Sequence, residues 1–524
     1  MLEDMGQLFA NPMGTLKQLR SLGAENVRVA VIWSYIAPWP NSTRPPARFN
    51  AADPAAYPAA NWAIWDQIVV DAKQEGIAVN FDVTGGAPLW ALGPGRPSGN
   101  KNPNWEPSPS RYRAFVHALG VRYSGGYDPT LKRTVRDSAD LPRVSFWSIW
   151  NEPDYGPSLA PQGVPGDLAV ENSPRMYRNL VDAAWTALHQ TGHGRDGFIW
   201  GELAPRDTGS RWGVFAGMAP LVFLRAMYCV DSSYRPLRGA AAAIRGCPKS
   251  AAGSRVFRAH NPALFAASGV SDHAYMRWYP PNDEQDPSPD FSSLGQIGNL
   301  ERGLDRLQRA YGSSRRFPIW NTEFGYITDP PKHSPDPTST GIRVLYVSPA
   351  TAAYYVNWAE YISWRDPRIA SFFQYLLRDP QPANAADNWG GFASGLLSFN
   401  GGLKATYDAW RLPLYMPLTT ARRGHTLEVW GCIRPARYAL LDMGVPQVAE
   451  IQFQKGLQGA FKTLRTVALP SASSSCYFDV HVKFPASGAV RLRWLYPTLD
   501  PLLGYFDPLH PAAAVSRSVR ISLN

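Results

Sequence analysis

Long apolar runs, clustered basic residues and metal-binding motifs are all missing from this sequence of 524 residues. No stretch approaches the ~20 apolar residues of a transmembrane helix, so we expect no membrane span. The first residues, Met-Leu-Glu-Asp-Met-Gly, hold neither a basic nor an apolar segment, so we expect no export signal in this chain. The net charge is +10, but the arginines are scattered, which favours a solvated basic surface over a nucleic-acid site.

Cysteine is also scarce, with four residues, and neither a Cys-x-x-Cys motif nor a His-rich cluster occurs. We therefore expect no metal site and no cofactor. The four residues form two local pairs, Cys229 with Cys247 and Cys432 with Cys476. This pairing favours two disulfides and a secreted or extracytoplasmic location, the alternative being four unrelated reduced thiols. The sequence carries no indication of the oligomeric state.

What the sequence does contain is a regular alternation of short apolar runs with longer amphipathic stretches, over residues 1–412. This alternation is typical of β-α units with a parallel sheet. Two of the predicted strands end at Glu152 and Glu323, and the other six cover residues 1–5, 26–33, 76–83, 197–202, 269–278 and 369–377. Eight strands with interleaved helices predict a (β/α)8 TIM barrel.

The pattern changes after residue 412, where short strand-like runs are separated by Gly, Pro and Ser. The runs cover residues 426–429, 437–441, 448–454, 461–467, 476–484 and 490–495. They predict a small all-β sandwich over residues 413–524, behind a barrel over residues 1–412.

Two predicted strands share one unusual ending. Residues 144–154 read Val-Ser-Phe-Trp-Ser-Ile-Trp-Asn-Glu-Pro-Asp, and residues 317–325 read Phe-Pro-Ile-Trp-Asn-Thr-Glu-Phe-Gly. In each, an apolar strand stops at a glutamate that Pro or Gly follows closely. By strand count these are the fourth and seventh strands, whose carboxyl ends lie on one face of a barrel. We therefore expect Glu152 and Glu323 to be neighbours.

Paired carboxyl groups suit the cleavage of a glycosidic bond, in which one group donates a proton while the other is ionised. A lone glutamate at a strand end is more often a structural carboxylate, but two with the same context favour catalysis. The alternation in residues 26–33 places Arg28 on the same side as Ala30, facing the interior, where it needs a partner. An arginine and a tyrosine beside Glu323 would lower its pKa, which favours Glu323 as nucleophile and Glu152 as acid/base.

These residues resemble a known group of enzymes. Trp150-Asn151-Glu152-Pro153 resembles the Asn-Glu-Pro signature of glycoside hydrolase clan A, and residues 320–325 resemble the nucleophile strand of its families 39 and 5. Asp154, after the proline, is more like family 39. The resemblance implies retaining hydrolysis of a β-type, or equivalently equatorial, glycoside, with Glu152 as acid/base and Glu323 as nucleophile. The leading hypothesis is a glycoside hydrolase that acts on an oligo- or polysaccharide. It also implies contacts to the sugar or the nucleophile from Asn151, Arg28, His273 and Tyr275.

The sequence holds 19 tryptophans, more than a core ordinarily uses. Four of them fall at predicted strand exits or loops, where a flat ring can stack on a sugar: Trp33, Trp90, Trp278 and Trp389. The alternative for each is packing in the core, the commoner place for Trp. Among these four we favour Trp389 as a sugar contact, since turn residues surround it.

Two other functions stay open at this stage. One is a glycan-binding protein that keeps the barrel without turnover, and the presence of both glutamates argues against it. The other is a transglycosylase, which uses the same intermediate and differs only in the acceptor. Loss of aryl-glycoside hydrolysis in the variant Glu323→Gln separates a catalytic from a purely binding role.

Overall fold

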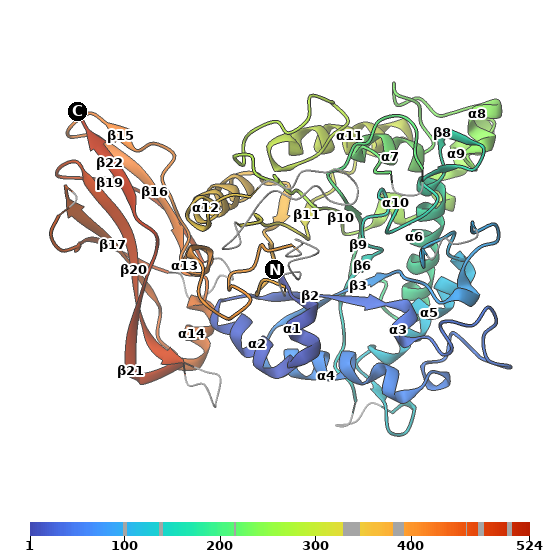
Figure 1. The fold of residues 1–524 in the computed structure, drawn as a ribbon, viewed down its shortest axis with the longest axis horizontal. Coiled ribbons are helices and arrows are strands. Elements are labelled where there is room, and N and C mark those ends of the chain that lie inside the picture. The colour runs from blue at the N-terminus through green and yellow to red at the C-terminus, as the bar shows by residue number, and fades with distance from the viewer. Residues whose placement is uncertain are drawn as a thin grey trace, which may run out of the picture.

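The structure is a computed structural model that describes residues 1–97, 102–135, 140–213, 216–328, 346–380, 392–456, 458–469, 476–499 and 506–524. Its larger part is a parallel sheet surrounded by helices (Figure 1). The strands of this sheet are β1 (Leu2–Glu3), β2 (Asn26–Ile32), β3 (Ala78–Thr84), β6 (Phe146–Ile149), β9 (Gly197–Leu203), β10 (Gly269–Asp272), β11 (Ile319–Asn321), β12 (Ile369–Ser371) and β13 (Gln374–Tyr375).

Helices follow the strands along the chain and cover the outside of the sheet (Figure 1). They are α1 (Met5–Ala10), α2 (Pro12–Ser21), α3 (Trp33–Ile36), α4 (Ala59–Glu75), α5 (Pro109–Arg122), α6 (Ser173–Gln190), α7 (Pro220–Met227), α8 (Gly239–Ile244), α9 (Ala251–His260), α10 (Ala263–Ala266), α11 (Ile297–Ala310), α12 (Pro349–Arg365) and α13 (Ala405–Arg411). Two small hairpins lie in the loops: β4 (Tyr127–Asp128) with β5 (Arg133–Thr134), and β7 (Gly163–Val164) with β8 (Asp167–Glu171).

The sheet closes on itself. Its strand order is β12-β11-β10-β9-β6-β3-β2-β1-β13, and all the pairs are parallel. Because β12 and β13 are two halves of one eighth strand, the sheet begins and ends on the same segment. The predicted barrel is confirmed, and β6 and β11 are its fourth and seventh strands.

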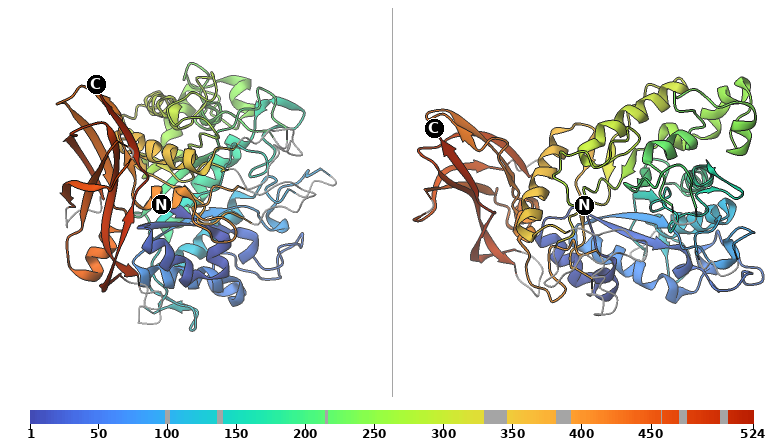
Figure 2. Two further views of the ribbon diagram at one scale, coloured as in Figure 1. Left: turned by 60° about the vertical axis from the view of Figure 1, so that its left-hand side comes forward. Right: turned by 45° about the horizontal axis from the view of Figure 1, so that its top comes forward.

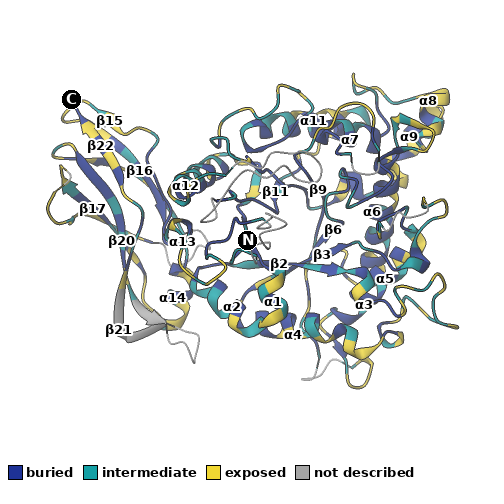
Figure 3. Cartoon of the chain, viewed as in Figure 1, coloured by how far each residue is buried: buried dark blue, intermediate teal, exposed yellow. Residues whose placement is uncertain are grey.

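Local sequence explains where several of these elements start and stop. Helix α2 begins with Pro12 at its first position, behind Asn11, whose side chain accepts a hydrogen bond from the backbone N–H of Gly14. Helix α4 ends at Gly76, which takes the left-handed conformation with φ of 69°. In Figure 3 the barrel strands are mostly dark blue, whereas exposed residues gather on the outer helices and loops.

The C-terminal part forms two sheets beside the barrel, next to α12 and α13 (Figures 1 and 2). One sheet contains β14 (Leu414–Tyr415), β16 (Thr426–Cys432) and β19 (Tyr477–Lys483). The other contains β15 (Thr420–Ala421), β17 (Val448–Lys455), β18 (Lys462–Ala468), β20 (Gly488–Leu499), β21 (Phe506–Val515) and β22 (Val519–Leu523). The sheets face each other closely, because a Cβ on Gly431 would lie 2.7 Å from the Leu492 side chain. The predicted all-β architecture is confirmed, while the boundary at 412/413 stays a prediction.

Three predicted elements differ from the structure. Residues 437–441 are not a strand but belong to helix α14 (Ala436–Met443), which Gly444 ends in the left-handed conformation. The first strand is β1 alone, because Asp4 caps helix α1 by accepting a hydrogen bond from the backbone N–H of Gln7. The sixth strand ends at Asp272, so the next residues lie in a loop at the carboxyl end of the barrel.

Both predicted disulfides are formed. Cys229 pairs with Cys247 in the segment between β9 and β10, and Cys432 pairs with Cys476 between the C-terminal strands. Among the described residues, no helix is both long and apolar enough to cross a membrane. The disulfides support the predicted extracytoplasmic location, which we keep as a proposal.

Candidate active site

Arg28 lies at the centre of a cluster of buried polar groups at the carboxyl end of the barrel strands. The alternation along β2 points its side chain into the barrel, where it is 1% exposed. Its guanidinium donates hydrogen bonds to Glu323 at 3.0 Å and to Asn151 at 2.8 Å. Three further carboxylates complete its surroundings, from Glu3, Asp82 and Glu202. The buried arginine therefore has the acidic partners that it needs, in the form of four carboxylates.

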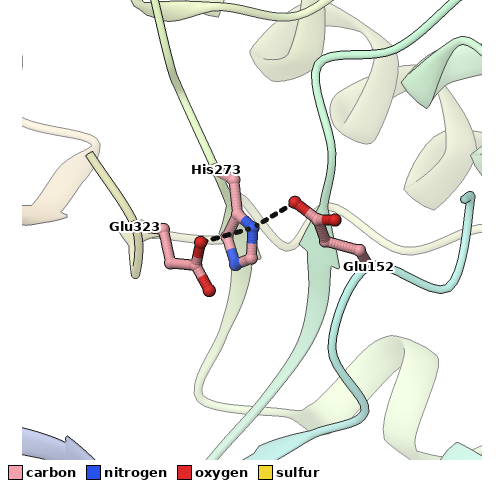
Figure 4. Close-up of side chains that lie close together, drawn as sticks. All are labelled: Glu152, His273 and Glu323. Carbon is pink, nitrogen blue, oxygen red and sulfur yellow. Dashed lines mark hydrogen bonds and ion pairs between the residues drawn. The ribbon is translucent and has the colours of Figure 1, made fainter. Parts of the chain in front are cut away.

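Glu152 and Glu323 meet at one imidazole ring. Figure 4 shows His273 between the two carboxylates. Its Nδ1 lies 3.1 Å from Glu152 Oε1 and 3.5 Å from Glu323 Oε2. One oxygen from each glutamate and this nitrogen all lie within 4.8 Å of one another. The two strand-end glutamates, far apart in sequence, are thus neighbours as predicted.

Two more predicted residues contact this pair. The Tyr275 hydroxyl donates a hydrogen bond to Glu323 Oε2 at 3.0 Å. Asn151 accepts from Arg28 through Oδ1, and its backbone N–H donates to the Thr84 hydroxyl. Its side-chain nitrogen has no hydrogen bond to any described residue, which leaves that N–H₂ group to donate to a bound molecule.

A third glutamate, Glu202, completes the cluster and was not predicted. It lies at the end of β9, has no exposed surface, and accepts a hydrogen bond from His273 Nε2 at 2.8 Å. Arg28 and the Thr322 hydroxyl also donate to it, each at 2.9 Å. A signal existed in the sequence, since Glu202 ends the predicted fifth strand as Glu152 and Glu323 end theirs.

The charges in the cluster shift the pKa values of its members in different directions. Burial raises the pKa of Glu323 to about 7, although His273 and Arg28 oppose this effect. Burial also favours a high pKa for Glu152, but the hydrogen bond and positive charge of His273 outweigh it and lower the pKa. Arg28 acts on Glu323 in the predicted direction, but the predicted net decrease in the pKa was wrong, because loss of hydration has the larger effect.

His273 and Glu202 form an ion pair inside this cluster. Burial lowers the pKa of His273, but the surrounding carboxylates, Glu323 first, raise it well above its usual value. For Glu202, burial is outweighed by Arg28 and His273, and its pKa falls to about 2.

Glu152, His273 and Glu323 have the donor types and spacing of a metal site. The protonated ring, however, has no lone pair for a metal, so the cluster is suited to moving protons.

A cavity of about 210 Å³ opens beside these groups. Glu323, Arg28, Asn151 and Asp82 line its polar side. Ala30, Ile32, Gly85 and Tyr375 add apolar and backbone surface, and Glu3, Thr84, Asn104 and Ser158 complete the lining. Such a mixture of apolar walls and a few converging polar groups is typical of a small-molecule site.

The predicted tryptophans do not gather at this cavity. Trp33 has no exposed surface, because its ring stacks on Phe115 and meets Trp90 edge to face. Trp90 is also buried, and its indole N–H donates to the backbone carbonyl of Pro38. The prediction that these two rings bind sugar was wrong, because both are buried, with Phe115 stacked on Trp33 and the Arg111 guanidinium over the ring of Trp90.

Of the other two tryptophans, only Trp278 is among the residues that the structure describes. Trp278 is half-buried and stacks on Tyr279 with a ring separation of 5.1 Å. It remains a candidate sugar contact, without a contact to Glu152 or Glu323 among the described residues. Trp389 lies outside the described residues.

Comparisons with known proteins find similarity only to solved structures, at low sequence identity. No protein-family model matches the sequence, and no curated protein matches it either. Similar solved structures include a family 39 glycoside hydrolase from Bacteroides cellulosilyticus WH2, with 14% identity, a TM-score of 0.41, and coverage of 90% of this chain and 77% of that one. A glucosidase from Croceicoccus marinus has 13% identity and a TM-score of 0.44, over 97% of this chain and 88% of that one. An endo-β-1,4-mannanase from Thermotoga petrophila has 8% identity and a TM-score of 0.39, over 100% and 97%.

Proposed function

We propose that this protein is a retaining glycoside hydrolase that cleaves O-glycosidic bonds of an oligo- or polysaccharide, and that it belongs to clan A. One observation carries the proposal: carboxylates from the fourth and seventh barrel strands converge within 4.8 Å, around one imidazole. Retaining glycosidases hold their two carboxyl groups about 5–5.5 Å apart, whereas inverting enzymes need more room for a water molecule.

In the first step, a Glu323 oxygen attacks the anomeric carbon, and Glu152 gives its proton to the departing glycosidic oxygen. A glycosyl ester on Glu323 and an ionised Glu152 result. In the second step, Glu152 takes a proton from water as the water oxygen attacks the same carbon. The ester bond breaks, Glu323 leaves as a carboxylate, and the configuration is restored.

His273 accounts for how the proton reaches the correct carboxyl group. In the unliganded protein, the pKa order of the two glutamates favours a proton on Glu323 rather than on Glu152. The Nδ1–H of His273 is within reach of Glu152, and the same nitrogen is close to Glu323. His273 can pass its proton to Glu152 and take one from Glu323, which leaves Glu323 ionised for attack and the ring still charged.

Around this pair, the other residues hold the reacting groups in place. Arg28 and Tyr275 each donate to one oxygen of Glu323, which fixes the orientation of the carboxylate. The free N–H₂ group of Asn151 is placed to bind a hydroxyl of the sugar beside the reacting carbon. No cofactor enters these steps.

A panel of aryl glycosides assayed with wild type, Glu323→Gln and Glu152→Gln tests the proposal. We expect the Glu323 variant to lose at least about 10⁴-fold in kcat, since no nucleophile remains. We expect the Glu152 variant to lose about 10²–10⁴-fold, with least loss for the best leaving groups. Circular dichroism checks that both variants fold. Turnover that is unchanged in the folded Glu323 variant would rule out its role as nucleophile.

A further inference from the structure

Two arginines near the proposed acid/base residue have no acidic partner. Arg206 follows β9 and Arg277 follows β10, so both lie on loops at the end of the barrel that carries Glu152. Neither makes an ion pair or a side-chain hydrogen bond with any described residue. Arg206 is half-buried, and its guanidinium lies 4.8 Å above the centre of the Tyr155 ring.

The position of Arg206 is fixed by the loop that carries Glu152. Tyr155, on which it packs, is three residues beyond Glu152 and forms a β-bridge with Gly217. A Cβ on Gly217 would lie 2.5 Å from Cβ of Arg206, so only glycine leaves room for the arginine there. Two residues before Arg206, the backbone N–H of Ala204 donates to Asp154 at 3.0 Å. Arg206 is therefore built into the site rather than free on the surface.

The charge of Arg206 acts on both Glu152 and Arg277. The charge of Arg206 adds to the effect of His273 in lowering the pKa of Glu152. The Arg277 residue is exposed, but partial burial of its guanidinium lowers its pKa, and the charge of Arg206 is the next cause. Because β9 and β10 are paired strands, the two arginines lie on neighbouring loops, and neither forms an ion pair with a described carboxylate, which leaves positive charge at the rim that carries the proton donor.

We propose that Arg206 and Arg277 form an anion-binding subsite on the leaving-group side of the cleaved bond, and that the substrate is an acidic glycan. This inference rests on the proposed function, because the leaving-group side is defined by Glu152 as the proton donor. The planar fork of a guanidinium matches the oxygens of a carboxylate or a sulfate, the two anionic groups common on sugars. The subsite would hold either group on the sugar that departs first.

An acidic leaving group would also help the chemistry. When an anion neutralises Arg206, one cause of the low pKa of Glu152 is removed, and Glu152 holds its proton more readily. A bound anion then favours proton donation by Glu152 as well as binding of the substrate. A surface that is merely solvated and basic would attract acidic polymers without this local effect.

Binding to the inactive variant Glu323→Gln, measured by calorimetry, tests the subsite separately from turnover. The probes are glucuronic-acid-bearing xylo-oligosaccharides with their carboxyl-reduced forms, and chondroitin sulfate oligosaccharides with their desulfated forms. We expect at least one acidic probe to bind about tenfold or more tightly than its neutral partner, the scale of a charge-assisted hydrogen bond. The pair that shows the preference tells a carboxylate from a sulfate.

Charge-matched double variants in the same background locate the effect. Arg206→Gln with Arg277→Gln is expected to abolish the preference. Arg255→Gln with Arg520→Gln, two exposed arginines on α9 and β22, removes the same charge and is expected to keep it. Arg206→Lys with Arg277→Lys, which preserves the charge and lacks the fork, should keep part of it.

Three results would overturn the subsite. They are equal binding of acidic and neutral probes, a preference that survives Arg206→Gln with Arg277→Gln, and a preference lost equally in the control pair. Thermal unfolding of each variant, together with the partial retention in the lysine pair, separates loss of the subsite from loss of the fold. Failure of aryl-glycoside turnover would instead concern the proposed function, since the binding assay needs no turnover.

Discussion

The location of one proton among Glu152, His273 and Glu323 decides what this cluster can do. Five carboxylates surround two cations, Arg28 and His273, and the surplus negative charge keeps protons on some of the acids. Glu202 stays ionised, whereas burial leaves Glu323 able to hold a proton up to about pH 7. Activity is therefore expected to depend on pH through Glu323.

The first prediction concerns this dependence. Above about pH 7, the pair loses the proton that Glu323 holds and that His273 passes to Glu152, so kcat/KM for an aryl glycoside should fall about tenfold per pH unit. Glu152→Gln needs no such proton for dinitrophenyl glycosides, whose leaving groups depart with little help from an acid, so its profile should lose this alkaline limb. It should show an acid limb below about pH 7 instead, because Glu323 must be ionised and the charge of Glu152 no longer raises its pKa. An alkaline limb that persists in the variant would contradict the shared proton.

The second prediction concerns Glu202 as a positioning residue. Glu202→Gln removes the carboxylate that holds Nε2 of His273, so the pKa of His273 should fall and its ring should lose its fixed orientation. We expect kcat to fall about 10–100-fold, and the alkaline limb of the profile to move to lower pH. Glu284→Gln, at an exposed glutamate, serves as control. A loss of kcat with an unmoved alkaline limb would indicate a purely structural role.

At the scale of elements, the sequence predicted the placement of the glutamates for two reasons. Side chains alternate between the two faces of a strand, and the apolar run of each strand stops at a clear position. The alternation of β2 pointed Arg28 inward, and the apolar runs before Glu152 and Glu323 marked β6 and β11. What failed depended on tertiary contacts. Nothing in the local sequence says that Phe115 covers the face of Trp33.

Two further differences have the same cause. Glu202 became part of the site only because β9 lies beside β10, so that His273 reaches its carboxylate. The pKa order of Glu152 and Glu323 was also missed, since loss of hydration depends on how the whole barrel closes over them. The sequence could predict that these residues lie at one rim of the barrel, but it could not predict how deeply they are buried.

The third prediction tests burial within one helix. Asp182 on α6 has its pKa raised by burial to about 7, although Arg178 opposes this. The folded state therefore binds more protons than the unfolded state between about pH 4 and 7, and stability falls as pH rises through that range. Asp182→Asn should stabilise the protein by about 1–3 kcal/mol at pH 8 and have little effect at pH 4.

Urea unfolding at the two pH values measures this difference, with the exposed Glu284→Gln as control. A variant that is destabilised at pH 8 would show that Arg178 depends on the charge of Asp182.

At the scale of the whole molecule, ionic contacts join the C-terminal part to the barrel. Arg434 lies 2.6 Å from Glu360 of α12, and the Tyr477 hydroxyl donates to the same carboxylate at 2.7 Å. On the opposite side of the contact, Arg20 of α2 pairs with Asp442 of α14. These residues are not among the partners of Arg28 or His273, so we expect the contacts to contribute to stability rather than to chemistry.

The fourth prediction follows from the disulfide in this part. Cys432 and Cys476 are 44 residues apart, so removing their link should cost about 4 kcal/mol through the entropy of the unfolded chain. In Cys432→Ser with Cys476→Ser, we expect the C-terminal sheets to unfold at lower temperature than residues 1–412. Calorimetry should then show two transitions, with aryl-glycoside hydrolysis lost only in the second. A single transition with simultaneous loss of activity would contradict the boundary at 412/413.

The account as a whole depends on Glu323 as the nucleophile of a retaining reaction. Incubation with a panel of 2-deoxy-2-fluoro dinitrophenyl glycosides, followed by peptide mass mapping, tests this most directly because the fluorinated intermediate hydrolyses slowly. We predict one covalent sugar on Glu323 in the wild type and none in Glu323→Gln. A sugar on Glu152 instead, or hydrolysis products released with inverted configuration, would contradict the account.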